Sequence, residues 1–219
     1  KYNDSNKEAF NPSDNMNGGK ISLIKYKDKS NIYFSIARGY KQGGFNLGLD
    51  ATDNSIRESL IFDPEFLTNY EIGFTSNSNN SNINYSAVLF FSEREDQQVL
   101  ISKQVDPTDP NTFSYITQNA AEGKNYGLEL SSNYLVTDNL NLYANVGLLK
   151  TKIKNWESRA DLENRSQAHA PERTYAVGIN LNLKNNFYLK MDITGKSSFY
   201  YSDSHNNKSK SYQLANLLI

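Results

Sequence analysis

The feature that most restricts the fold of this chain is an alternation of apolar and polar residues that returns in segment after segment. The clearest case is the segment 140–148, which reads LNLYANVGL. Successive side chains of a β-strand point to opposite faces of the sheet, so a period of two predicts a strand with one apolar face and one more polar face. The segment 31–37, NIYFSIA, shows the same period.

This alternation predicts an all-β, antiparallel up-and-down protein of about nine long strands. The expected strands cover residues 20–26, 31–41, 65–75, 83–102, 113–134, 140–148, 175–183, 187–194 and 210–219. The connections alternate between short turns, such as 137–139, and long polar loops, such as 154–172. In bacterial outer-membrane barrels the periplasmic turns are short and the extracellular loops are long, and this chain has the same rhythm.

Composition excludes several other classes of protein. The 23 Lys and Arg residues nearly balance the 24 Asp and Glu residues, so no nucleic-acid partner is indicated. Cysteine is absent and only His169 and His205 supply imidazole, so we expect no metal site, no cofactor and no catalytic residues. No run of about 18 apolar residues occurs, which argues against a transmembrane helix.

The stretch 31–46 changes character part of the way along. After its alternating first half it carries Arg38, Tyr40 and Lys41 and then a glycine pair, Gly43 and Gly44. Glycine relaxes the steric limits on the backbone, so we interpret this stretch as a membrane strand that leaves the bilayer and turns into a loop.

Five phrases of the sequence resemble those of one family, in the same order. The stretch 37–46, ARGYKQGGFN, is similar to the SRGYKxGGFN phrase of TonB-dependent outer-membrane receptors. Four further phrases resemble that family: PEFLTNYEIG at 64–73, NYGLEL at 125–130, APERTY at 170–175 and SYQLANL at 211–217. Together these phrases span nearly the whole chain.

The resemblance implies a fold and a function. Such receptors are barrels of about 22 strands that are plugged by an N-terminal domain. We therefore expect residues 1–219 to be part of the barrel domain, without the plug, the signal peptide or the final strands. The implied protein lies among the lipids of the bacterial outer membrane and imports a scarce nutrient, such as an iron chelate, a cobalamin or a glycan. The TonB complex would act on it through the missing plug.

Two other functions stay open on the sequence alone. The first is a passive porin-like or adhesion barrel that needs no TonB. The second, less favoured, is a soluble all-β module that binds or hydrolyses carbohydrate. Solubility without detergent would support this last function and contradict the membrane interpretation.

The candidate residues for substrate binding or for the barrel lumen are Arg38, Tyr40, Lys41, Phe45, Asn46, Glu71, Glu129 and Trp156. Arg38 and Lys41 would contact an anionic substrate or, alternatively, reach to the membrane interface and lipid head groups. Glu71 and Glu129 share the polar strand face, where a structural carboxylate is the simpler explanation because barrel lumens are polar. Trp156 would stack on a ligand or cap its own loop.

Overall fold

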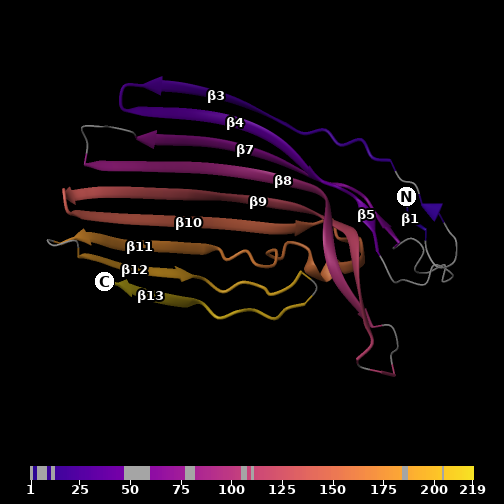
Figure 1. Cartoon of the computed structure of the whole chain (residues 1–219). Coiled ribbons are helices and arrows are strands. Elements are labelled where there is room, and N and C mark those ends of the chain that lie inside the picture. The colour runs from indigo at the N-terminus through magenta and orange to yellow at the C-terminus, as the bar shows by residue number, and fades with distance from the viewer. Residues whose placement is uncertain are drawn as a thin grey trace.

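The architecture is one antiparallel sheet of nine strands in the order β13-β12-β11-β10-β9-β8-β7-β4-β3. The computed structural model describes residues 2–3, 9–10, 13–46, 60–76, 82–104, 108–109, 111–183, 187–203 and 205–219. The strands lie side by side in a curved sheet, as Figure 1 shows. The all-β, up-and-down class predicted from the sequence is confirmed, and each strand of this sheet pairs with its neighbours in chain order.

The strands of the large sheet are β3 (Gly19–Lys27), β4 (Ser30–Lys41), β7 (Glu65–Ser76), β8 (Ile83–Gln104), β9 (Phe113–Thr137), β10 (Leu140–Lys154), β11 (Arg173–Asn182), β12 (Tyr188–Lys196) and β13 (Tyr212–Leu218). Two small ladders accompany the sheet, and they pair β1 (Tyr2–Asn3) with β2 (Ala9–Phe10) and β5 (Gly44–Phe45) with β6 (Ile61–Phe62). A 3₁₀ helix, η1, covers Glu157–Leu162.

Short and long connections lie at opposite ends of the sheet (Figure 1). Two-residue turns join β3 to β4 at Asp28-Lys29 and β9 to β10 at Asp138-Asn139. In the second turn the Thr137 hydroxyl accepts hydrogen bonds from the backbone N–H groups of Asn139 and Leu140, at 3.3 and 3.1 Å. The longer connections, from β4 to β7, β8 to β9, β10 to β11 and β12 to β13, all lie at the other end, here called the loop end.

The register places apolar side chains on one common face of the sheet. One row of directly paired residues crosses six strands through Leu23, Phe34, Ile72, Leu89, Leu128 and Leu148. This face is called the apolar face below. Its side chains stay accessible, and Leu23 and Leu89 are 71% and 55% exposed.

The opposite face, called the polar face, holds hydrogen-bonded side chains. Glu71 accepts a hydrogen bond from the Asn69 amide at 2.8 Å, and longer ones from the hydroxyls of Tyr33 and Ser35 at 3.5 Å. The Ser92 hydroxyl donates in turn to Asn69 at 2.6 Å. The alternation of the sequence has therefore separated polar from apolar side chains across the sheet.

The buried hydrophobic cluster of the described residues lies at the loop end, where β8 and β10 meet the β10–β11 connection. It consists of Val99, Ile153, Trp156 and Leu162, all no more than 4% exposed. A soluble sheet protein buries one sheet face against another layer. Here the apolar side chains of the sheet remain exposed, and the buried cluster forms under the loops.

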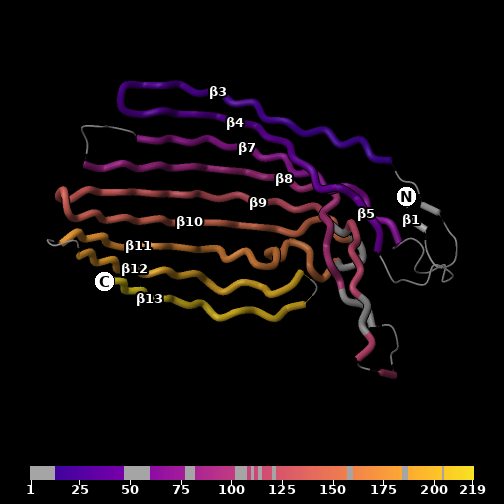
Figure 2. Tube along the Cα trace, viewed as in Figure 1, coloured from indigo at the N-terminus to yellow at the C-terminus, as the bar shows by residue number. Residues whose placement is uncertain are grey.

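The hairpin of β8 and β9 runs past the rest of the sheet and bends away from it, as the trace in Figure 2 shows. The bend coincides with a β-bulge, because the pairing register shifts between Arg94 and Gln97 and again between Gln97 and Gln98. Asp96, inside the bulge, has a φ of 52°. Aspartate tolerates the left-handed region better than most residues, which suits it to this position.

Aromatic rings lie over glycines of the neighbouring strand on the polar face. Tyr33 is paired with Gly73, and a Cβ added to that glycine would lie 2.1 Å from the tyrosine ring. A Cβ at Gly127 would similarly lie 2.7 Å from the ring of Phe90, its partner in β8. An aromatic ring that covers a glycine restores the side-chain contact that the glycine lacks and helps to fix the register.

We expect Gly73→Ala to destabilise the sheet because the added methyl group collides with the Tyr33 ring. Overpacking of this kind costs about 1–3 kcal/mol. The measurement is urea unfolding of the full-length protein in detergent micelles. Gly39→Ala is the matched control, since nothing lies within 4 Å of the added Cβ. Equal stability of the two variants, or an undiminished effect in a Tyr33→Ala background, would contradict this packing.

Candidate functional site

Parts of the four long connections meet at the loop end and contact one another in the order of the strands they join. The described parts of these connections, together with the ends of β8 and β9 beyond the bulge, are called the loop layer below. Loops carry most binding residues in proteins that use a rigid sheet as a scaffold. The geometry of this layer therefore decides what surface the chain offers to a ligand.

Asn46 attaches the connection after β4 to strand β9. Its side-chain amide donates to the carbonyl of Thr117 and accepts from the Thr117 N–H, both at 2.7 Å. These two bonds resemble those of a paired strand residue, and Asn46 is only 6% exposed. The backbone N–H of Asn46 also donates to the carbonyl of Leu60 at 2.8 Å, which holds the β5–β6 ladder closed.

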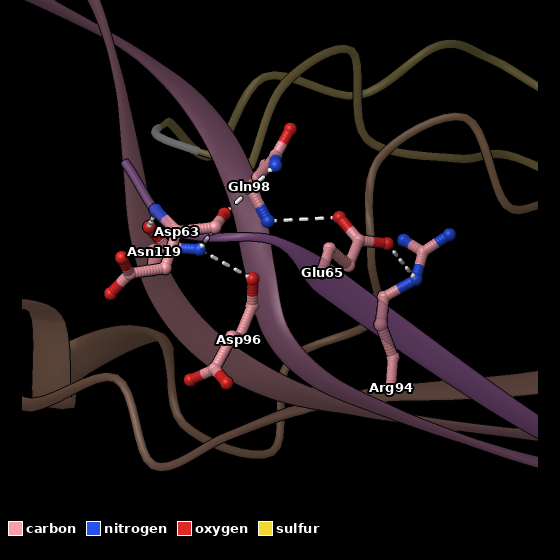
Figure 3. A network of polar contacts seen from close by, with 6 residues as sticks. All are labelled: Asp63, Glu65, Arg94, Asp96, Gln98 and Asn119. Carbon is pink, nitrogen blue, oxygen red and sulfur yellow. Dashed lines mark hydrogen bonds and ion pairs between the residues drawn. The ribbon is translucent and has the colours of Figure 1, made fainter. Parts of the chain in front are cut away.

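A polar network fixes the entrance to β7 against the bend of the β8–β9 hairpin (Figure 3). The Asn119 side chain accepts from the Asp63 N–H at 2.6 Å and donates to the carbonyls of Asp63 and Asp96. Glu65, 8% exposed, forms an ion pair with Arg94 at 2.9 Å and accepts from the backbone N–H of Gln98 at 2.9 Å. The buried carboxylate thus has both a cation and a backbone donor.

The two glycines allow other groups to pack closely against the backbone, and they are not needed for an unusual backbone conformation. Neither Gly43 nor Gly44 has a left-handed φ. A Cβ at Gly43 would lie 2.6 Å from the carbonyl oxygen of Phe62, and one at Gly44 would lie 2.7 Å from the Phe62 ring. The sequence interpretation of this pair as a release of steric limits on the backbone is therefore wrong in its reason, although β4 does end at Lys41 as expected.

Hydrophobic packing joins the β8–β9 hairpin to the β10–β11 connection. Trp156 is 2% exposed and packs with Val99 of β8 and with Leu162 of η1. Two buried amides, Gln97 and Gln167, approach Gly123 of β9 closely, and a Cβ there would lie 2.8 and 2.5 Å from their polar atoms. These close contacts hold the β10–β11 connection against the β8–β9 hairpin.

Arg165 connects the β10–β11 loop to the β12–β13 loop. Its guanidinium donates to the carbonyls of Ser202 and His205 at 2.9 and 2.8 Å and to the Asn206 side chain at 3.0 Å. It also lies 4.4 Å above the Tyr200 ring. Arginine suits such a position because its planar fork reaches several acceptors while its face stacks on an aromatic ring.

Among the predicted site residues, Arg38, Tyr40 and Lys41 lie together at the loop end of β4. Tyr40 is 52% exposed, and Lys41 is exposed as well. Arg38 lies on the apolar face, forms an ion pair with Glu95 at 3.3 Å and stacks 4.6 Å from the Phe66 ring centroid. Both partners of this ion pair are accessible to solvent, which makes it a weak one.

The other candidates do not converge on these three. Phe45 is half-buried in β5, and Asn46 is buried in its contact with Thr117. Trp156 is buried in the loop layer, which agrees with the alternative that it caps its own loop. Glu71 and Glu129 lie on the polar face of β7 and β9, with β8 between them.

Sequence reasoning missed the residues that hold the loop layer together, chiefly Gln98, Asn119 and Arg165. Each is a polar residue in a polar stretch, and its partner lies far away in the sequence. The pairs Asn46–Thr117 and Asp63–Asn119 are 71 and 56 residues apart. The one available signal was the row of amides at 97–98, which lacks the alternation of the strand before it.

The described residues contain no group of three or more His, Asp or Glu side chains placed to hold a metal ion. Within the same part of the chain, no helix has the length and hydropathy needed to cross a membrane.

A meander of long antiparallel strands, apolar on one face and polar on the other, with its loops gathered at one end, is the wall of an outer-membrane type of β-barrel. The profile of the TonB dependent receptor-like β-barrel family matches residues 1–219. The chain therefore belongs to this family, whose members are outer-membrane receptors that transport and are not enzymes.

Individual relatives agree with this assignment. The probable TonB-dependent siderophore receptor PiuA of Acinetobacter baumannii is 29% identical over 152 residues, which are 68% of this chain and 19% of that protein. The structure of the ferric yersiniabactin uptake receptor FyuA of Yersinia pestis has a TM-score of 0.70 at 18% identity, over 91% of this chain and 29% of that one. The PiuA structure has a TM-score of 0.69 at 21% identity, over 90% and 28%.

This chain thus spans less than a third of the length of the relatives that it matches. The two structural likenesses establish the shared fold of the barrel wall.

We expect Asn46→Ala to detach the connection after β4 from β9, because it removes both side-chain bonds to Thr117. The loss of buried hydrogen bonds should cost about 1–3 kcal/mol locally. Hydrogen exchange read by mass spectrometry on the full-length protein should show faster exchange at Thr117 and at residues 60–64. Asn133→Ala, on an exposed part of β9, is the control and should change neither. Unchanged exchange in Asn46→Ala would refute the role assigned to this amide.

Proposed function

We propose that this chain is part of the barrel wall of an outer-membrane receptor that captures a scarce nutrient and imports it with energy from the TonB complex. The observation that carries the proposal is the match of the whole chain to the receptor barrel family, together with the two-faced sheet whose loops gather at one end. In this proposal residues 1–219 are a partial barrel domain, and the plug and the remaining strands belong to other parts of the receptor.

The two faces of the sheet take different roles in this proposal. The apolar face meets lipid and the polar face lines the lumen, as in other membrane barrels. The backbone groups of the sheet bond to one another, which a strand in lipid requires. Long loops are extracellular in such barrels, so the loop layer faces the medium and the Asp28-Lys29 and Asp138-Asn139 turns face the periplasm.

The proposed ligand is an iron chelate, and the siderophore receptor among the relatives supports this class over a cobalamin or a glycan. The loop end offers exposed cationic and aromatic side chains that suit an anionic or aromatic chelate, including Tyr40, Lys41 and Tyr115. Arg38 and Phe45 border this surface. Asn46 and Trp156 are both buried, so they support this surface and do not form part of it.

The lumen residues Glu71 and Glu129 have a supporting role in this proposal. Glu71 is held by Asn69, Tyr33 and Ser35, so its position on the polar face is fixed. Glu129 is exposed on the same face. Both carboxylates point to the side where a plug would lie, and a plug that moves under TonB would exchange contacts with such groups. No covalent chemistry and no cofactor enter this mechanism.

The decisive experiment measures accumulation of radioactive iron by cells that express the full-length receptor, supplied with a panel of ferric siderophores. We expect one member of the panel to be taken up, and we expect uptake to stop when an uncoupler removes the proton-motive force. Surface binding at low temperature should persist under the uncoupler. Uptake that continues without proton-motive force would identify a passive barrel and would overturn the proposal.

We expect Val146→Arg to impair folding into lipid bilayers, since Val146 lies on the apolar face of β10, an interior strand of the sheet. An arginine on the lipid side costs about 2–4 kcal/mol near the bilayer midplane. The measurement is the urea midpoint of the full-length receptor refolded into vesicles. Asn145→Arg, one residue away and on the polar face, is the matched control and should cost much less. Equal destabilisation of the two variants would show that the faces are assigned incorrectly.

A further inference from the structure

Three cations lie close together on the apolar face at the loop end. Lys150 and Lys152 follow Leu148 at two-residue spacing on β10, so they share its face. Arg173, the first residue of β11, is paired with Leu148 across the ladder. Among the described residues none of these three side chains forms an ion pair or a hydrogen bond.

Two neighbouring cations on the same face, unlike these three, form ion pairs with carboxylates. Arg38 is paired with Glu95, and Lys124 is paired with Glu93 at 2.9 Å. Lys152 lies directly opposite Lys124 in the β9–β10 ladder. Glu93 compensates the charge of Lys124, so Lys152 keeps a neighbouring like charge and has no carboxylate partner of its own among the described residues. An anion from outside the chain would supply that partner.

An apolar groove of about 890 Å³ leads up to these cations. Its walls are mostly aliphatic and aromatic side chains of β4, β7, β8, β9 and β10, including Phe34, Ile72, Leu89 and Leu128. Lys150 and Arg173 line it as well, beside Leu148. Two carboxylates, Glu71 and Glu172, are among the residues that line the groove. Glu71 is bonded to Asn69, Tyr33 and Ser35 on the polar face, so the three cations and Glu172 leave a net positive charge there.

We propose that this groove binds a phosphate-bearing lipid of the membrane leaflet on the loop side, with its phosphates on Lys150, Lys152 and Arg173 and an acyl chain along the apolar walls. The assignment rests on the proposed function, because it requires the apolar face to meet lipid. Arginine binds phosphate through its forked donors and lysine binds it as a point charge. A free phosphate ion would satisfy the cations but would leave the apolar groove uncovered, so the occupant is a lipid.

The test uses the full-length receptor in nanodiscs that contain a small fraction of lipid A with two phosphates, and native mass spectrometry reads the bound lipid. Lipid A from which both phosphates have been removed is the matched probe. We expect the receptor to prefer the phosphorylated probe. The triple variant Lys150→Gln, Lys152→Gln, Arg173→Gln should lose on the order of a hundredfold in that affinity, at about 1 kcal/mol for each cation near the membrane surface.

Two further variants keep the test independent of folding. Lys25→Gln with Lys27→Gln removes two cations from the same face at the turn end, and it should bind the phosphorylated probe normally. The charge-preserving variant Lys150→Arg, Lys152→Arg, Arg173→Lys should also bind it. The proposal is overturned if the triple glutamine variant binds normally, if both probes bind equally, or if inorganic phosphate displaces the lipid completely.

The outcome is separable from that of the proposed function. These cations lie on the face opposite the lumen, so the triple glutamine variant should retain the affinity of the receptor for its ferric siderophore. If the receptor imports iron but binds lipid A equally well with and without its phosphates, only the lipid site is refuted. A receptor that binds phosphorylated lipid A but imports no siderophore would refute the proposed transport function alone.

Discussion

The backbone register of the nine-stranded sheet is the constraint on which the rest of the structure depends. Because the side-chain period of a strand is two, a slip of one residue in one ladder would move every apolar side chain of that strand to the other face. The row from Leu23 to Leu148 crosses six strands without such a slip. Tyr33 over Gly73 and Phe90 over Gly127 fit together only in this register. Separation of lipid-facing from lumen-facing residues follows directly from it.

The sheet was predictable from the sequence because its signals are local. The alternation in 140–148 and the short turn expected at 137–139 together specify a hairpin. The structure has this hairpin, with Thr137 still in the strand and Asp138-Asn139 as the turn. The loop layer was not predictable, because its contacts join residues that are distant in the chain. Nothing near Asn46 indicates that its amide will meet Thr117, and nothing near Trp156 indicates burial against Val99. Of the candidate site, only the grouping of Arg38, Tyr40 and Lys41 follows from strand geometry, since all three lie at one end of β4.

The glycine pair at 43–44 shows a further limit of sequence reasoning. Glycine is used both where the backbone needs a positive φ and where another group approaches too closely for a Cβ. The sequence cannot separate these two uses, since both favour the same residue. At Gly43 the second use applies, because the Phe62 carbonyl occupies the space of a Cβ. The phrase that most resembles the family therefore owes its glycines to the packing of β6 against β5 and not to a sharp turn.

The loops of the loop layer contact one another in the same order as the strands beneath them. The β8–β9 hairpin therefore has a neighbouring loop on each side. On one side Asn119 and Gln98 hold the entrance to β7, and on the other side Val99 packs against Trp156 of the β10–β11 connection. Arg165 then extends the contacts to the β12–β13 loop. A displacement of the hairpin about its bulge at Asp96 would have to break contacts on both sides at once. The surface that the loops offer to a ligand is thus held in place by neighbouring loops as well as by the strands beneath them.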